Sequence, residues 1–307
     1  VFQHAYCTTA SCSASRSVIL TGLHNHSNGQ YGHQHSYHNF HTHLSVRSLP
    51  VLLSEAGYRT ASIGKYHVQP ESVYHFDTYL KGNQGGSRNA VTMAQKCRAW
   101  LGEESARPFF LYFCTSDPHR SGRQAGHPLS RPDFFGNGRK YNGVNEQTFK
   151  PGDVSVPPYL PDTPECRREL AQYYQSVARL DQGLGLLVKT LKELKLYDNT
   201  LILYLSDNGI AFPGAKTNLY EPGMRLPLVV RTPGQKKRGG STNAMVSWTD
   251  LAPTILDFAG ATPKKYKFHG RSFLGALDEE NPKGWDEVYA SHTFHEITMY
   301  YPMRVLR

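Results

Sequence analysis

Cys12 and Arg16 are the first residues along the sequence whose types and spacing could do chemistry. Cys12 starts a short stretch of helical character that Gly22 is expected to end, and Arg16 follows four residues after the cysteine. Residues at this spacing lie on the same face of a helix, so the guanidinium would lie beside the thiol. A helix N-terminus attracts anions, and a nearby cation strengthens that preference. An isolated Cys-x-x-x-Arg is nevertheless more typical of a buried cysteine with a surface arginine.

A second pair, Asp207 and Asn208, comes directly after the apolar run Leu201 to Leu205. A carboxylate oxygen and an amide oxygen at a strand end are ligands that suit a hard cation such as Ca²⁺ or Mg²⁺. Followed by Gly209, the same residues are also typical of an ordinary Asp-Asn-Gly turn. The residues alone leave both interpretations open.

Apolar runs and helical repeats indicate the elements that must position these residues. Continuous apolar runs predict strands buried on both faces of a sheet at Phe109 to Cys114, Leu201 to Leu205 and Leu228 to Val230. A helix is predicted from Ser48 to Gly57, and a longer one from Thr163 to Leu194. Residues 120–160 lack periodicity and predict a long surface excursion. Strands that alternate with helices predict an α/β fold with its site at the strand ends.

Composition limits the class of protein and its partners. The 307 residues carry 34 Lys and Arg against 25 Asp and Glu, a formal net charge of +9, which favours anionic partners. No apolar run approaches the roughly 20 residues that span a bilayer, so we expect no membrane segment. Five cysteines at wide spacings, without a Cys-x-x-Cys pair, do not form a disulfide framework.

Further blocks follow the segment Cys12-Ser13-Ala14-Ser15-Arg16 over most of the chain. They are Ile63-Gly64-Lys65-Tyr66-His67, Ser116-Asp117-Pro118-His119, Ser206-Asp207-Asn208-Gly209, Lys216 to Glu221, Arg225-Leu226-Pro227 and Asp250 to Thr254. In content and order they resemble the formylglycine-dependent sulfatases. The resemblance implies an alkaline-phosphatase-like α/β core, with a large mixed sheet flanked by helices, and conversion of Cys12 to formylglycine. Ala14 stands where the family more commonly has proline.

The resemblance also implies roles for the residues in these blocks. A sulfuryl group in transfer spreads negative charge over its oxygens, so it needs surrounding cations and an acid for the leaving atom. The expected set is Arg16, Lys65, His67, His119 and Lys216, with His67 as base and His119 with Lys216 for leaving-group protonation and sulfate clamping. Cys12, Asp207 and Asn208 would hold one Ca²⁺, with Mg²⁺ as the alternative. Taken singly, each histidine or lysine is more typical of an ordinary surface or packing residue.

A narrower likeness is to the branch of the family that removes the N-sulfo group of glucosamine in heparan-type chains. It rests on Arg47-Ser48-Leu49-Pro50 and on the segment His295 to Arg304, in which His295, Glu296 and Arg304 are candidate substrate-binding residues. The same three residues could instead form a hinge between domains. An O-sulfatase acting on another sulfated polysaccharide, a phosphate or phosphonate monoester hydrolase, and a catalytically inactive glycan-binding homologue stay open as alternatives.

The family resemblance also implies what the sequence lacks. Sulfatases carry an Asp-Asp pair at the end of their first strand, upstream of the nucleophile, and residues 1–11 contain no acid. We therefore expect a catalytic domain over residues 1–290 without its first strand, and residues 291–307 as the start of a small C-terminal domain. The expected partners are a sulfated glycan and a formylglycine-generating enzyme, with no nucleic acid; a homodimer stays open. The expected location is extracytoplasmic, although no signal segment is present.

The segment His24 to His43 is rich in histidine. Clustered histidines can bind a transition metal, but this spacing fits no standard zinc pattern. We interpret these histidines mainly as residues that line a pocket and form hydrogen bonds. A second metal site is the alternative.

Overall fold

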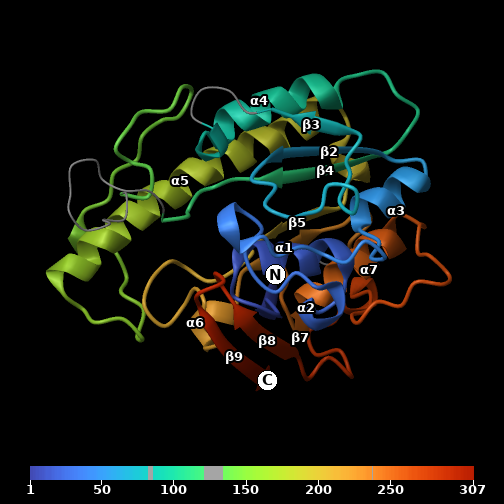
Figure 1. Cartoon of the computed structure of the whole chain (residues 1–307). Helices are drawn as coiled ribbons and strands as arrows, with labels where there is room; N and C mark the ends of the chain where they lie inside the picture. The colour runs from blue at the N-terminus through green and yellow to red at the C-terminus, as the bar shows by residue number, and fades with distance from the viewer. Residues whose placement is uncertain (82–85, 121–133, 237) are drawn as a thin grey trace.

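The computed structural model describes residues 1–81, 86–120, 134–236 and 238–307 (Figure 1). The strands in these ranges are β1 (Phe2–Tyr6), β2 (Arg59–Gly64), β3 (Thr78–Leu80), β4 (Phe109–Cys114), β5 (Ile202–Leu205), β6 (Leu228–Arg231), β7 (Thr242–Ser247), β8 (Tyr289–Phe294) and β9 (Tyr300–Leu306). The α-helices are α1 (Cys12–Thr21), α2 (Asn25–Asn28), α3 (Leu49–Glu55), α4 (Ala90–Leu101), α5 (Pro164–Glu193), α6 (Glu221–Met224) and α7 (Leu251–Phe258).

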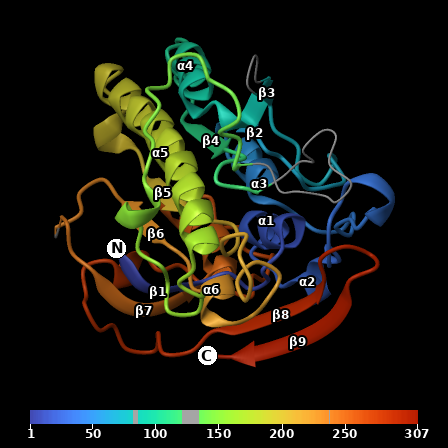
Figure 2. The same cartoon turned by 90° about the vertical axis from the view of Figure 1, so that its left-hand side faces the viewer.

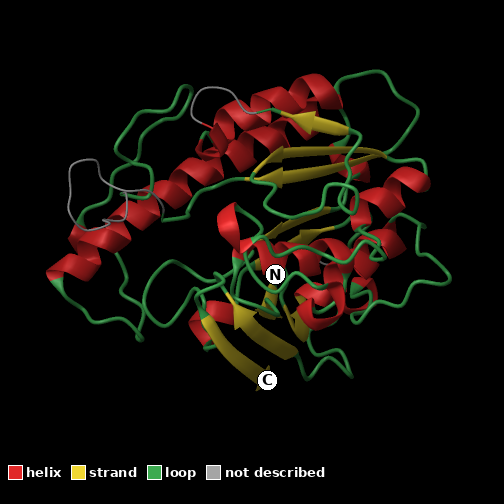
Figure 3. Ribbon diagram, in the orientation of Figure 1, coloured by secondary structure: helices red, strands yellow, loops and turns green. Residues whose placement is uncertain are grey.

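The described strands form three sheets, which Figure 3 shows in yellow. The first has the order β5-β6-β1-β7, with β1 parallel to β7 and antiparallel to β6. The second has the order β3-β2-β4, with β2 parallel to both neighbours. The third is the antiparallel hairpin β8-β9. The expected α/β fold is confirmed, but the strands that we expected in one large mixed sheet are divided between the first two sheets.

Helices lie on both faces of the sheet that contains β2 and β4 (Figure 2). On one face α4 and α5 pack against β2 and β4 through a core that includes Met93, Trp100 and Leu187. On the other face α3 and α7 pack together through Leu53 and Leu256, with Phe110 of β4 against them. This layering follows from the apolar stripes of the helices, which are buried only when they lie on a sheet.

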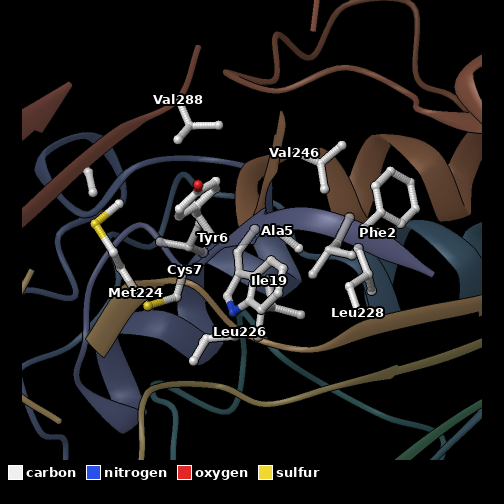
Figure 4. Packing of buried hydrophobic residues seen from close by; sticks show 14 of the residues in the cluster. Phe2, Ala5, Tyr6, Cys7, Ile19, Met224, Leu226, Leu228, Val246 and Val288 are labelled. Atoms are coloured by element: carbon white, nitrogen blue, oxygen red, sulfur yellow. The ribbon is translucent and has the colours of Figure 1, made fainter. Parts of the chain in front are cut away.

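The largest apolar core lies around β1, a strand that the sequence analysis did not identify. Phe2 and Tyr6 of β1 are buried among side chains of β6 and β7, and Ile19 of α1 packs into the same cluster (Figure 4). The hairpin closes this core through Ala290. Because α1 is anchored here, its first residue has a fixed position.

The predicted elements agree closely with the structure. The strand predicted at Phe109 to Cys114 is β4, and the other two runs differ from β5 and β6 by one residue at one end. The predicted helices are α3 and α5, and Thr163 caps α5 by accepting from the backbone N–H of Cys166 at 3.2 Å. Residues 134–160 form a mostly irregular excursion, while 121–133 lie outside the described residues.

One prediction about the strands is wrong in part. Every residue of β4 and of β5 is only half-buried, although both were expected to be buried on both faces. The reason is that within the described structure β4 pairs only with β2 and β5 only with β6, so each has one free edge. A cavity of about 1240 Å³, which we call the slot, is lined by both strands and extends to Asp207 and His119.

Candidate active site

The thiol of Cys12 lies at the N-terminus of α1 and is 1 % exposed. Its Sγ accepts hydrogen bonds from Lys216 Nζ and from Asn208 Nδ2, each at 3.4 Å. Lys216 reaches this position because the next backbone N–H, that of Thr217, donates to the carbonyl of Ala10 at 2.9 Å. Residues far apart in the sequence therefore meet at Cys12, as the family resemblance implied.

The surroundings of Cys12 favour a negative charge on its side chain. Burial alone would raise the pKa of the thiol, but Lys216 and Lys65, helped by contacts with His119 and His67, hold that pKa well below its usual range. A group that stabilises a thiolate at this position also stabilises other anions there.

Arg16 is buried and bridges two parts of the site. Its Nε donates to Asp207 Oδ2 at 2.8 Å, and its Nη1 donates to the carbonyl of Lys65 at 2.7 Å. Burial would lower the pKa of Arg16, but Asp207 raises it well above its usual range. Arg16 therefore stays charged and fixes the end of β2 relative to the end of β5.

His119 lies beside Lys216, whose Nζ donates to His119 Nε2 at 2.9 Å. Burial lowers the pKa of His119, and contact with Cys12 opposes the shift. The sequence analysis missed the residue that supports His119: Asp117 is buried and forms ion pairs with Arg88 at 2.7 Å and Arg179 at 2.6 Å. Arg88 also donates to the carbonyl of His119 at 2.7 Å. An acid two residues before a candidate histidine was the available signal.

His67 follows the end of β2 in a strained backbone conformation, with φ of +59°. Gly64 permits the turn, since a Cβ there would lie 2.0 Å from the carbonyl oxygen of Cys114. The Nε2 atom of His67 lies 2.7 Å from Nδ1 of His35. Burial lowers the pKa of His67, and contact with Cys12 opposes that shift. The ring is therefore held neutral beside Cys12, the protonation state that a base requires.

The residues expected to bind a divalent cation have suitable oxygen ligands, but too few of them. Asp207 and Asn208 lie next to Cys12, but Asp207 Oδ2 accepts from Arg16 and Oδ1 accepts from Asn208 Nδ2 at 2.7 Å. Ca²⁺ takes about six to eight oxygen ligands. Among the described residues, no second acidic residue joins Asp207 and Asn208 in a group that could hold a metal. Further oxygen ligands are needed to complete the set.

The three candidate substrate-binding residues differ in position. His295 lies next to the nucleophile, since its Nδ1 is 3.0 Å from Oγ of Ser11, the residue before Cys12. Glu296 is half-exposed, with Oε1 3.8 Å from Nε2 of His38. Arg304 is exposed on β9 and donates to the carbonyl of Met303; in the described structure it forms no hydrogen bond or ion pair with the residues around Cys12.

Comparison with known proteins identifies the family. The family model described as "Sulfatase" matches residues 1–261. This chain belongs to the sulfatase family. Human N-sulphoglucosamine sulphohydrolase is 42 % identical to it over 321 residues, an alignment that covers 99 % of this chain and 64 % of the human protein. This sulfatase chain thus spans just under two thirds of that relative's length.

Solved structures show the same sulfatase fold. A protein in complex with its substrate D-glucosamine-2-N,6-O-disulfate matches with a TM-score of 0.72 and 21 % identity, covering all of this chain and 79 % of the other. The phosphonate monoester hydrolase of Agrobacterium radiobacter matches with a TM-score of 0.72 and 19 % identity, covering all of this chain and 78 % of the other. None of the described helices is long and apolar enough to cross a membrane.

Proposed function

We propose that this sulfatase chain hydrolyses a sulfate from a glycan, with the N-sulfo group of glucosamine in heparan-type chains as its substrate. The observation that carries the proposal is the convergence on Cys12 of Lys216, Asn208, Lys65 and two histidines. The 42 % identity to human N-sulphoglucosamine sulphohydrolase supports the N-sulfo assignment over O-sulfates of other polysaccharides.

The residues of the site have different roles in this reaction. Formylglycine, made from Cys12 by a formylglycine-generating enzyme, would supply a hydrated aldehyde with one hydroxyl to attack sulfur and a second whose ionisation releases sulfate. Lys65 and Lys216 bind the negatively charged oxygens. Neutral His67 accepts a proton near residue 12, and the ammonium of Lys216, hydrogen-bonded to His119, is the proton source for the leaving nitrogen.

A divalent cation, Ca²⁺ or in its place Mg²⁺, would be held by Asp207, Asn208 and the modified side chain at position 12. Bound there, it would polarise sulfate oxygens. The carboxylate of Asp207 orients Arg16 from the same position, so Arg16 lies within reach of the bound anion.

We further propose that one additional strand, from chain preceding residue 1, fills the slot and belongs to the same catalytic domain. The free edges of β4 and β5 both border the slot, which fits a strand that pairs with both. Acidic residues at the end of that strand would lie near Asp207 and supply the oxygen ligands that the cation needs. Residues 291–307, mostly in the hairpin, then begin a C-terminal domain.

A sulfated glycan fits the net charge of +9, and an extracytoplasmic location fits a glycan substrate. A catalytically inactive glycan-binding protein is the second candidate, and it would bind the glycan while Cys12 stays a thiol. Phosphate and phosphonate monoesters are the other substrates to compare.

The test uses the protein with its upstream coding sequence, made together with a formylglycine-generating enzyme. We expect mass spectrometry to find formylglycine at position 12 and sulfate release from terminal N-sulfoglucosamine to exceed release from 6-O-sulfated N-acetylglucosamine and from phosphate esters. A thiol at position 12 in an active preparation would contradict the covalent mechanism. Faster turnover of the O-sulfated sugar would remove only the N-sulfo assignment.

A further inference from the structure

Three histidines from two parts of the N-terminal region come together beside Cys12. His33 and His35 belong to the histidine-rich segment, and His67 follows β2. One ring nitrogen from each of the three lies within 4.8 Å of those from the other two. In the described structure, this is the one group of three or more histidine, cysteine or acidic side chains that could hold a metal ion without further protein ligands.

We propose that His33, His35 and His67 form a binding site for a transition-metal ion of the Zn²⁺ class, separate from the oxygen-ligand site at Asp207. Zinc binds imidazole nitrogens at about 2.0 to 2.1 Å, which places two nitrogens of a tetrahedral site about 3.3 Å apart. The 2.7 Å between His35 Nδ1 and His67 Nε2 reaches that spacing after a small rotation of the exposed His35 ring.

The surroundings of the three rings support metal binding. Burial lowers the pKa of each ring, so each is neutral and has one lone pair. His33 Nδ1 lies 3.4 Å from Ser13 Oγ, a hydrogen bond of the kind that orients a metal-ligating imidazole through its second nitrogen. The donors are all nitrogen, which suits zinc, cobalt or copper better than calcium.

Metal bound at this site has a consequence for the base. A neutral imidazole has one lone pair and one N–H. When the metal takes the lone pair at His67 Nε2, the ring proton is on Nδ1, and no nitrogen is left to accept a proton. Zinc therefore inhibits turnover reversibly. This part rests on the proposed function, whereas metal binding does not.

The binding test adds Co²⁺, a spectroscopic substitute for Zn²⁺, to the 307-residue chain in excess Ca²⁺, which competes for oxygen ligands. We expect one equivalent to bind, with visible absorption bands and no charge-transfer band from thiolate. His35→Gln and His33→Gln should each weaken binding at least about tenfold. His41→Gln, in the same segment but outside the trio, is the matched control and should bind like the original chain.

Three results would overturn the site. They are no saturable binding, an affinity in H33Q and H35Q equal to that of the original chain, or a thiolate band that assigns the ion to Cys12. His35 is exposed, so H35Q should fold normally, and its thermal unfolding is compared with that of H41Q.

In active protein, zinc inhibition is measured relative to each variant's own zinc-free rate. H35Q should need at least about ten times more zinc for the same inhibition. Equal inhibition of H35Q and H41Q would overturn the effect on the base, while absence of turnover in all preparations would count only against the proposed function.

Discussion

The two sides of Cys12 are built from different chemistry. The cationic side consists of Arg16, Lys65 and Lys216, and the histidine side consists of His33, His35, His67, His292 and His295. In the described structure, Arg16 pairs with Asp207, whereas neither Lys65 nor Lys216 forms an ion pair with a carboxylate. The cationic side therefore carries positive charge that is available to an anion.

The histidine side is kept neutral by burial. Desolvation is the main reason that the pKa of His295 falls to about 3 and that of His292 to about 4. These rings offer lone pairs and N–H groups instead of charge. The cationic side suits anion binding and the neutral histidine side suits proton acceptance, because each function needs a different protonation state.

Removing charge from the cationic side should have the largest effect. Lys216→Met removes a hydrogen-bond donor and a positive charge from Cys12, so we expect turnover to fall by about 10² to 10³. In the unconverted chain the pKa of Cys12 should rise, which is measured from the rate of thiol alkylation against pH. Lys189→Met, at an exposed lysine on α5, is the control. An unchanged alkylation profile in K216M would show that Lys216 does not act on residue 12.

Breaking the ion pair of the cationic side should cost stability. Asp207→Asn leaves the charge of Arg16 buried without its partner, and we expect a loss of about 3 kcal/mol in the free energy of unfolding, measured with urea in metal-free buffer. Asp198→Asn removes an exposed partner of Arg231 and should cost less than about 1 kcal/mol. Similar losses in the two variants would mean that the buried pair contributes no more than a surface pair.

The histidine side should make the fold sensitive to acid. His292 has a pKa of about 4 in the folded chain, against about 6.5 when unfolded. The unfolded chain binds the proton first, so stability falls as the pH drops from about 6.5 to about 4, by about 2 kcal/mol from this ring at pH 5. His292→Asn should flatten the curve of unfolding free energy against pH, and His41→Asn should not. Parallel curves for H292N and the original chain would contradict the assignment.

The smallest expected effect concerns substrate choice at the edge of the histidine side. Glu296 is half-exposed and 3.8 Å from His38, so Glu296→Gln should change the preference for N-sulfated over 6-O-sulfated sugar only severalfold, with unchanged affinity for Ca²⁺. The ratio of the two kcat/KM values measures it. Arg304→Gln, at a residue with no hydrogen bond or ion pair to the Cys12 surroundings in the described structure, is the comparison. A larger effect from R304Q would indicate that β9 contributes more to substrate recognition than Glu296 does.

Much of the site was predictable from the sequence because its residues lie in short blocks with local structural signals. The start of α1 at Cys12, its end at Gly22 and the strand before Asp207 all follow from neighbouring residues. The side chains implied to surround Cys12 could be named from their blocks. The acid at position 117, two residues before His119, was a local signal, but its partners Arg88 and Arg179 could not be identified because they come from distant segments.

The sequence by itself determined the elements, the family and the candidate nucleophile, because these depend on periodicity, caps and short motifs. Tertiary structure decided which histidines gather, which strand edges stay unpaired and which groups lose their charge. Those properties depend on distances between segments up to hundreds of residues apart and on the water that packing removes. The pKa of His295, for example, is set by burial and by Lys216, and neither is visible in the residues beside it in the chain.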